Sequence, residues 1–438
     1  GFIMVLFGGI ISIKTISFLM FCVFAISALG YLLGRVSIKG VSLGTAGVFI
    51  VALLFGCFFY KFLDAQLTVK VGEVSKSYTS NALKIIENMG LILFVTAVGF
   101  IAGPNFFSNL KKNFKSYVLL GLLIIIIGGL SCAGCILFDV KVFGRDMEEA
   151  GAMLVGLLSG SLTSTPAFSA AKATVINTAE RNLEDIVSVG HGIAYLFGVI
   201  GVVLFVQIMP KFVKADMNKE RELLKAAETG EKKVYQGKLI DMDPFGFMPF
   251  ALACVVGILF GALDWGKMIA KLYWAIGHLF NNELVCPTWS FCLTTTGGCL
   301  LTSLVFGHFA HFGPVNVTPN EHTTKVFREL GLMLFLIGAG VAGGASFVKY
   351  FKGVYFIYGI IMTMLPMIIG YFFAKYVLKL SLLNNLGSIT GGMTSTPALG
   401  TLIQCAGTEE VASAYAATYP MALIAVVVIS QILIIIFR

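Results

Sequence analysis

A five-residue sequence, Thr-Ser-Thr-Pro-Ala, occurs twice in this chain, at 163–167 and again at 394–398, 231 positions later. Each copy interrupts a long apolar stretch, where proline removes a helical hydrogen bond and the neighbouring hydroxyls offer replacements. One polar break in each half predicts two structural repeats, each with a broken or re-entrant segment. Transporters built from such repeats hold their substrates at the breaks, so a transporter with its site there is the first hypothesis.

The composition excludes a soluble domain of this length. Hydrophobic residues make up 57% of the chain and charged residues only 12%, and the mean hydropathy is +0.90. Apolar runs of about 18 to 25 residues recur from end to end, long enough to cross roughly 30 Å of hydrocarbon as helices. Barrel strands would instead show short alternating segments. The expected fold class is therefore an all-α polytopic membrane protein.

The apolar runs fall into two halves of similar order. In the first half we expect spans near 16–34, 42–62, 88–107, 117–138 and 186–209, with the broken segment at 150–171. In the second half we expect spans near 246–263, 290–312, 330–348, 354–378 and 411–436, with the broken segment at 382–404. Five crossings per half would give two inverted repeats, because an odd number reverses the orientation of the second half.

The predicted domains are a first membrane repeat over 1–209, a charged cytoplasmic connector over 210–245 and a second membrane repeat over 246–438. The connector contains the one strongly charged block, Lys211 to Asp243, with a helix-friendly core from Glu220 to Ala227. Its Lys and Arg content agrees with the positive-inside rule.

Glycines extend the repeat beyond the five-residue sequence. Five positions match at a constant offset of 241, namely Gly90, Phe94, Gly99, Gly103 and Phe106 with Gly331, Phe335, Gly340, Gly344 and Phe347. GxxxG spacings occur in these tracts and beside both breaks, where they involve Gly160 and Gly391. Such spacing lets helix backbones approach closely. Tight packing is the favoured interpretation of these glycines, and substrate contact is the alternative.

The breaks themselves have the chemistry of an anion site. If Thr165 and Thr396 are N-caps, each proline begins a half-helix whose N-terminus carries about half a positive charge. Two such ends would cradle a carboxylate, with hydroxyls orienting it. The candidate substrate-binding residues are Gly160, Thr163, Ser164, Thr165, Pro166, Gly391, Thr394, Ser395, Thr396, Pro397 and Tyr419. The structural alternative is a pair of proline kinks, with aromatic packing as the role of Tyr419.

Ionisable residues near or within the spans are functional candidates by default. Glu87 and Arg328 occupy equivalent places ahead of matched spans, and His191 lies early in the fifth span. These three are the candidates for coupling, since a histidine can carry a proton. Anchoring of helix ends is the alternative for Glu87 and Arg328, and a polar packing contact is the alternative for His191.

The sequence gives little support for a nucleic-acid, metal or catalytic site. The formal net charge of +8 comes from Lys and Arg that sit mostly at segment ends, which favours lipid anchoring over nucleic acid as a partner. The nine cysteines are scattered. A metal at the Cys132–Cys135 pair would want further ligands nearby, so packing is the favoured role. We expect no metal or other cofactor, and no enzyme, because no GxxxxGK[ST] or HExxH motif occurs.

Several tracts resemble the aspartate:alanine exchanger family of bacterial permeases. In the first half these are Glu87-Asn-Met-Gly-Leu-Ile-Leu-Phe through Gly103-Pro-Asn-Phe-Phe, and Gly160-Ser-Leu-Thr-Ser-Thr-Pro-Ala. In the second half Arg328-Glu-Leu-Gly-Leu-Met-Leu-Phe-Leu, Gly391-Gly-Met-Thr-Ser-Thr-Pro-Ala-Leu and Ala414-Tyr-Ala-Ala-Thr-Tyr-Pro are similar to that family's second repeat. The resemblance implies a secondary transporter of the bacterial inner membrane, an antiporter of small carboxylates or amino acids, and a homodimer.

The chain departs from that family in two places. Many members carry a pair of soluble regulatory domains between the halves, whereas the connector here is only Lys211 to Asp243. Leu196 follows Tyr195 where the family tends to have Tyr-Pro. By analogy with other inverted-repeat carriers, we expect an elevator-like movement of one unit against a static dimer scaffold.

Three alternatives to exchange remain. A proton- or sodium-coupled carboxylate symporter would use unwound carbonyls at the breaks to hold the cation. An anion channel would need a continuous polar pore, and the spans contain few polar residues in series. A membrane enzyme would need two or more convergent ionisable groups, which the spans do not obviously supply.

Overall fold

The computed structural model describes residues 4–6, 11–38, 41–42, 46–71, 74–178, 183–225, 238–278 and 294–438. Over these residues the chain is predominantly helical, and eight helical stretches are long and apolar enough to cross a membrane. The helices are α1 (Thr15–Gly34), α2 (Ala46–Gln66), α3 (Thr79–Phe143), α4 (Met147–Ser161), α5 (Thr165–Thr178), α6 (Glu184–Phe212), α7 (Met217–Lys225), α8 (Phe247–Ala262), α9 (Trp265–His278), α10 (Thr294–Phe309), α11 (Glu321–Tyr350), α12 (Gly353–Tyr376), α13 (Leu382–Gly392), α14 (Thr396–Ala406) and α15 (Val411–Ile436). A helical polytopic membrane protein is therefore confirmed.

Short antiparallel hairpins, which the expected all-α class did not include, join some of the helices. They pair β1 (Met4–Leu6) with β2 (Ile11–Ile13), β3 (Ser37–Ile38) with β4 (Val41–Ser42), β5 (Thr68–Val71) with β6 (Val74–Ser77), and β7 (His311–Phe312) with β8 (Val315–Asn316).

The expected spans agree with α1, α8, α12 and α15 to within a few residues. The expected spans at 88–107 and 117–138 correspond to two candidate spans, Thr79–Ile101 and Lys111–Phe143, which the single helix α3 joins without a break. Pro104 stands inside α3 and removes only one backbone donor, so the helix continues on both sides of it. Two other differences are that α11 begins at Glu321 rather than near 330, and that the sequence analysis missed α9. Residues 226–237 of the connector and 279–293 lie outside the described residues.

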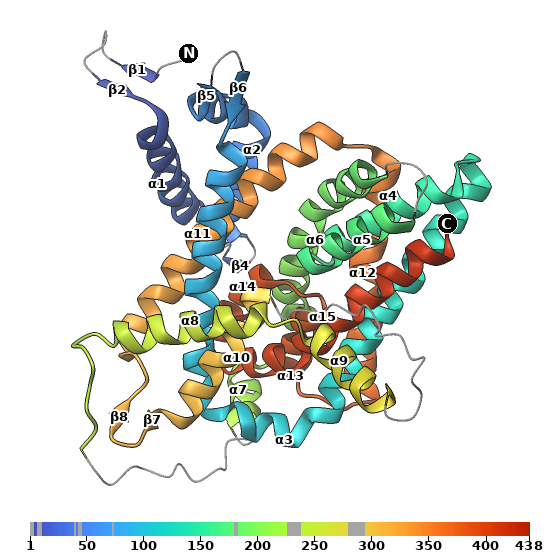
Figure 1. Cartoon of the computed structure of the whole chain (residues 1–438). Coiled ribbons are helices and arrows are strands. Elements are labelled where there is room, and N and C mark those ends of the chain that lie inside the picture. The colour runs from blue at the N-terminus through green and yellow to red at the C-terminus, as the bar shows by residue number, and fades with distance from the viewer. Residues whose placement is uncertain are drawn as a thin grey trace.

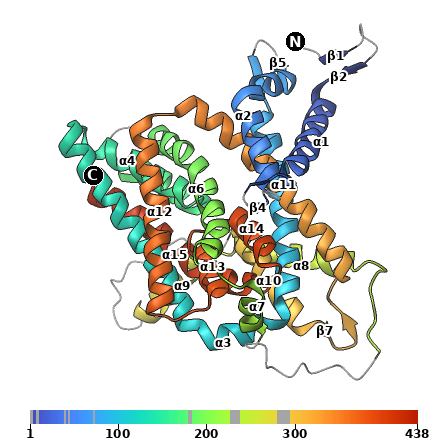
Figure 2. The same ribbon diagram turned by 180° about the vertical axis from the view of Figure 1, so that it is seen from behind.

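Most of the helices form two groups by their contacts. In both views α1 and α2 lie on one side of the molecule, α4 and α12 lie on the other, and α10, α13, α14 and α15 meet in the middle (Figures 1 and 2). Bundle A consists of α1, α2, α8, α10, α11 and the first part of α3, and bundle B consists of α4, α5, α6, α12, α13, α14, α15 and the last part of α3. Helix α3 therefore belongs to both bundles. Both helix breaks lie in bundle B.

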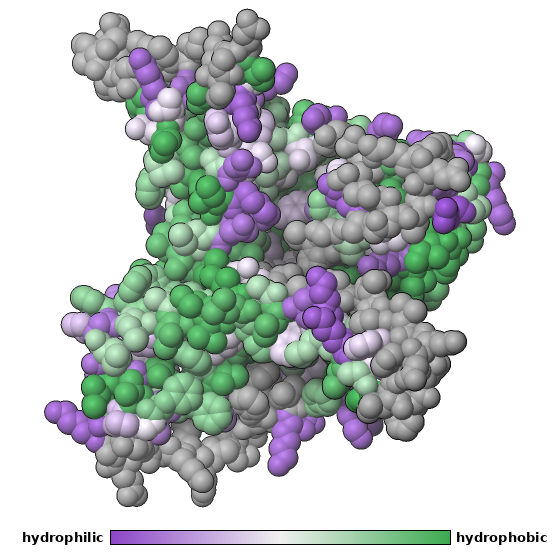
Figure 3. Space-filling model, in the orientation of Figure 1, coloured by the Kyte–Doolittle hydropathy of each residue, from purple (hydrophilic) through white to green (hydrophobic). Residues whose placement is uncertain are grey.

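The outer surface is that of a protein in a membrane. Figure 3 shows apolar side chains gathered over α8 and beside the end of α3, with hydrophilic residues between these areas and along the edges of this face. On α8, Phe247, Val255 and Leu259 are each more than half exposed. Apolar exposure on this scale suits contact with lipid tails, as expected for spanning helices.

Glycines allow close helix contacts in both halves of the chain. A Cβ atom on Gly30 of α1 would lie 2.4 Å from the Cα of Val48 in α2, and one on Gly257 of α8 would lie 2.5 Å from the Cα of Cys299 in α10. Where α3 crosses α11, the contacts are mutual. A Cβ on Gly90 would meet the amide nitrogen of Phe335 at 2.2 Å, and a Cβ on Gly331 would meet that of Phe94 at 2.4 Å. These close approaches need glycine.

Candidate functional site

Each Thr-Ser-Thr-Pro sequence separates two short helices. Helix α4 ends at Ser161 and α5 begins at Thr165, while α13 ends at Gly392 and α14 begins at Thr396. Between them Thr163 and Thr394 have positive φ angles of 50° and 51°, the left-handed region. The two breaks therefore have the same backbone form.

Backbone hydrogen bonds explain this form. The N–H of Ser164 donates to the carbonyl of Ser159 at 2.9 Å, and the N–H of Ser395 donates to that of Thr390 at 3.0 Å. With the matching bonds of Thr163 and Thr394 to Gly160 and Gly391, this is the Schellman motif that ends many helices. Glycine usually occupies its left-handed position, and a β-branched residue there is strained by about 1–3 kcal/mol.

The two strained threonines bond to the opposite break. The Thr163 hydroxyl donates to the carbonyl oxygen of Thr394 at 3.3 Å, and the Thr394 hydroxyl donates to that of Leu162 at 2.5 Å. The breaks, 231 residues apart in sequence, are thus in direct contact. Since glycine has no hydroxyl, these bonds explain how threonine is stabilised in a position that glycine usually fills.

The serines of the two breaks differ in their bonding. Ser164 accepts the N–H of Ala167 through its Oγ at 3.2 Å and so caps α5. Ser395 is the N-cap of α14 but makes no capping bond, and its buried hydroxyl has no hydrogen-bond partner among the residues that the structure describes. The prediction of Thr165 and Thr396 as N-caps is wrong by one residue, because each helix already begins at its threonine. The side chains of Thr165 and Pro166 lie outside the described residues, and Pro397 is in the first turn of α14.

Replacing Ser164 with alanine is expected to lower the stability of the protein, since loss of an N-cap costs about 1 kcal/mol. The same change at Ser395 is expected to leave stability unchanged or slightly higher, because an unpaired buried hydroxyl contributes no bond. Thermal unfolding of the two purified variants in one detergent measures the contrast. Equal losses of stability in both would contradict this description of the breaks.

Two tyrosines lie behind the second break. The hydroxyls of Tyr415 and Thr396 are 3.4 Å apart, and the ring of Tyr419 stacks on that of Tyr415 with centroids 5.4 Å apart. Tyr419 was predicted from the sequence, whereas Tyr415, which lies one turn earlier on the same face of α15, was not. Tyr195 lies elsewhere, against Gly343 of α11.

His191 is connected to the first break through Ser159. Its Nδ1 lies 2.8 Å from the Oγ of Ser159, whose hydroxyl also donates to the carbonyl of Gly156 at 2.7 Å. Because that hydroxyl has one proton, Nδ1 is the donor of the pair. The imidazole ring stacks on Phe168 of α5 with centroids 4.4 Å apart. His191 therefore spans the two helices that flank the first break.

Gly160 and Gly391 contact helix backbones. A Cβ on Gly160 would lie 2.3 Å from the carbonyl oxygen of His191 in α6, and one on Gly391 would lie 2.6 Å from that of Tyr415 in α15. These contacts are those of close helix packing, the role that the GxxxG spacing favoured.

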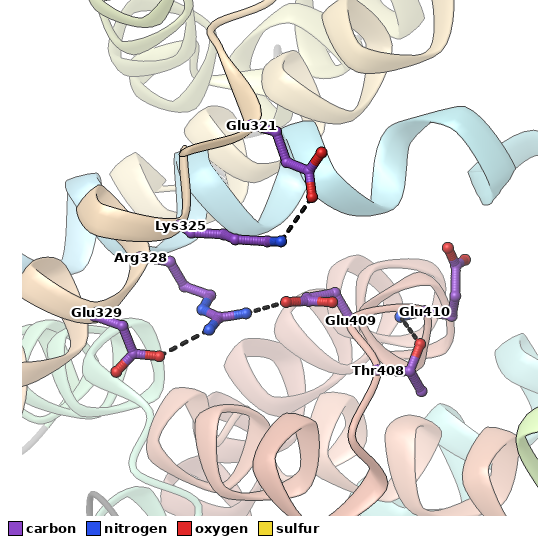
Figure 4. Close-up of polar contacts among 7 residues, drawn as sticks. All are labelled: Glu321, Lys325, Arg328, Glu329, Thr408, Glu409 and Glu410. Carbon is purple, nitrogen blue, oxygen red and sulfur yellow. Dashed lines mark hydrogen bonds and ion pairs between the residues drawn. The ribbon is translucent and has the colours of Figure 1, made fainter. Parts of the chain in front are cut away.

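Glu87 and Arg328 pair with charged residues outside the two Thr-Ser-Thr-Pro sequences. Glu87 pairs with Lys84 of α3 at 3.0 Å. Arg328 of α11 pairs with Glu329 at 2.8 Å and with Glu409, which follows α14 (Figure 4). The pair of Arg328 with Glu409 connects bundle A to the end of a broken segment in bundle B.

The second break is closed off from solvent. Ser395 is fully buried, and Thr394 is 7% exposed. Beside α14, a cavity of about 50 Å³ is lined by Phe49 and Leu336 of bundle A and by Gln207, Pro397 and Thr401 of bundle B, among others. Ligand pockets usually have at least ~300 Å³, so this cavity is too small to hold a metabolite in this conformation.

In comparisons with known proteins, this chain is similar to a permease family and to proteins named as transporters. A family model described as a predicted permease membrane region matches residues 22–211 and 249–435, leaving out the connector. An uncharacterized transporter of Bacteroides fragilis is 25% identical, over 94% of this chain and 97% of the relative. Uncharacterized transporters of Bacteroides thetaiotaomicron and Rhodopirellula baltica are 24% and 25% identical, over 94% and 92% of this chain and 97% and 96% of the relatives.

Proposed function

The chain belongs to the aspartate:alanine exchanger family and is a membrane transport protein, and from this premise we propose that it is a secondary antiporter of small carboxylates or amino acids. The substrate would bind at the paired breaks without chemical change, and alternating access would carry it across the bacterial inner membrane. The observation that supports this most is the unpaired, fully buried hydroxyl of Ser395 at the start of α14. Buried polar groups nearly always have a partner, so one without a partner at a helix start suits a ligand.

The second break has the better chemistry for an anion. The N-terminus of α14 carries a partial positive charge, and its own N-cap side chain does not cap it. The hydroxyls of Thr396 and Tyr415 lie beside it. In the first break the equivalent serine already caps α5. We therefore assign the carboxylate of the substrate to the N-terminus of α14, and the first break to holding the second in place.

Inverted repeats would give this carrier its two states. The first half has five candidate spans, and the second half has three together with the two shorter apolar helices α8 and α10. An odd number in each half reverses the second half relative to the first, and two such halves can exchange conformations at nearly equal energy. Bundle B, which holds both breaks, would move against bundle A, and bundle A would form the dimer contact.

Uptake of labelled aspartate, and of a panel of dicarboxylates and amino acids, into proteoliposomes tests the proposal. We expect uptake only when the vesicles contain an unlabelled substrate, because an antiporter changes between its two conformations only with a substrate bound. Uptake driven by a proton or sodium gradient into empty vesicles would instead establish the symporter. Passive flux that neither saturates nor requires internal substrate would indicate a channel.

A further inference from the structure

The connector helix α7 contacts the outer ends of the second broken segment. Helix α7 packs against α13, and its Leu224 is buried. Two adjacent residues of α7, Glu220 and Arg221, make hydrogen bonds to backbone groups at opposite ends of the segment α13–α14. The segment is thus held at both ends by one turn of a helix that lies outside the membrane repeats.

Glu220 caps the first turn of α13. Its Oε2 accepts the N–H of Leu382 at 3.1 Å. The N-cap residue, Ser381, makes no capping bond. In the first half, by contrast, α4 is capped by its own Asp146, whose carboxylate accepts the N–H of Glu149 at 3.1 Å. The second broken segment therefore relies on the connector for a contact that the first makes for itself.

Arg221 forms a hydrogen bond to the last turn of α14. Its Nη1 donates to the carbonyl oxygen of Ala406 at 2.9 Å, and its Nη2 donates to the side chain of Asn218. The next residue, Gly407, has a φ of +66°, and a Cβ there would lie 2.9 Å from Nη1. Both charges suit the helix dipole, with the carboxylate at an N-terminus and the guanidinium at a C-terminus.

We propose that Glu220 and Arg221 are positioning residues for the substrate site, and that the connector adjusts substrate affinity through them. This inference rests on the proposed function, because the site they position is the break that contains Ser395. Fixing the outer ends of α13 and α14 fixes where their inner ends meet. A movement of α7 then shifts the N-terminus of α14 and the Ser395 hydroxyl together.

The test compares Glu220→Gln and Arg221→Gln with Glu222→Gln and Lys219→Gln, which change exposed charges of the same helix. Backbone amide exchange by mass spectrometry directly reports whether Glu220 and Arg221 protect the two ends of the segment α13–α14. We expect exchange in residues 382–385 for Glu220→Gln, and in 403–407 for Arg221→Gln, to become about tenfold faster, with both controls unchanged. Glu220→Asp and Arg221→Lys are expected to restore part of the protection.

Transport kinetics in proteoliposomes distinguish positioning from general stability. The half-saturating substrate concentration is expected to rise about fivefold in both test variants while the maximal rate changes less than about twofold, a loss of binding alone. Unchanged amide exchange, or faster exchange with an unchanged half-saturating concentration, would overturn the proposal. Absence of exchange transport in the unmodified protein would overturn the proposed function instead, and the amide contrast would still decide whether α7 holds the segment.

Discussion

Replacing Ser395 with alanine is expected to raise the substrate concentration for half-maximal exchange about 10- to 100-fold, since a hydrogen bond to a charged group contributes about 1.5–3 kcal/mol. The hydroxyl is buried at the start of α14 and has no protein partner. Its removal leaves the fold intact, so the effect should be on binding. Concentration-dependent exchange in proteoliposomes measures it.

The matched control for this variant is Ser430→Ala. Ser430, in α15, is also fully buried with an unpaired hydroxyl, but it lies far along the chain from either break. Its replacement should leave the half-saturating concentration unchanged. Equal effects of the two variants, or none from Ser395→Ala, would remove Ser395 from the substrate site.

Reversing the charge at Arg328 is expected to lower the maximal exchange rate about tenfold, which corresponds to about 1.4 kcal/mol. Arg328 joins α11 to Glu409 at the end of α14, and also contacts Glu329 (Figure 4). A glutamate there would face two carboxylates in a partly buried place. Because alternating access needs end states of similar energy, destabilising this conformation should trap the protein in the other one.

Two further variants decide whether loss of the contact between the bundles causes the lower exchange rate. The double variant Arg328→Glu with Glu409→Arg restores opposite charges and should recover most of the rate. Lys325→Glu disturbs a pair with Glu321 that lies within α11, at 2.6 Å, and should have little effect. A rate that stays low in the double variant, or that falls equally in Lys325→Glu, would assign Arg328 a role other than joining the bundles.

Much of the helical architecture could be predicted from the sequence. Helix α15 has the expected limits, Val411 and Ile436, because an apolar run with polar flanks determines a span. The same signal predicted both spans of α3 but not their union in one helix, because lysines near 111 indicate a membrane boundary without ending the helix. Helix α9 was missed because it is short and carries Lys267 and Lys271 among its apolar residues.

The location of the breaks could be predicted, and their chemistry only in part. Proline and hydroxyl residues identify a helix break from local sequence alone. The difference between Ser164 and Ser395 could not be predicted, since identical sequences surround them and tertiary packing decides which hydroxyl finds a partner. The contacts of Tyr415 with Thr396, of His191 with Ser159 and of Arg328 with Glu409 likewise join different helices, which no periodicity reveals.

The position of the bound substrate is the most direct test of the account. Once the uptake measurements in proteoliposomes have identified a substrate, an electron cryo-microscopy structure of the protein saturated with it should show the anionic group of the substrate at the N-terminus of α14. The expected distance to the Ser395 Oγ is about 2.7–3.0 Å, the range of such a hydrogen bond. Density for the anionic group at any place other than the N-terminus of α14 would contradict the assignment of the site.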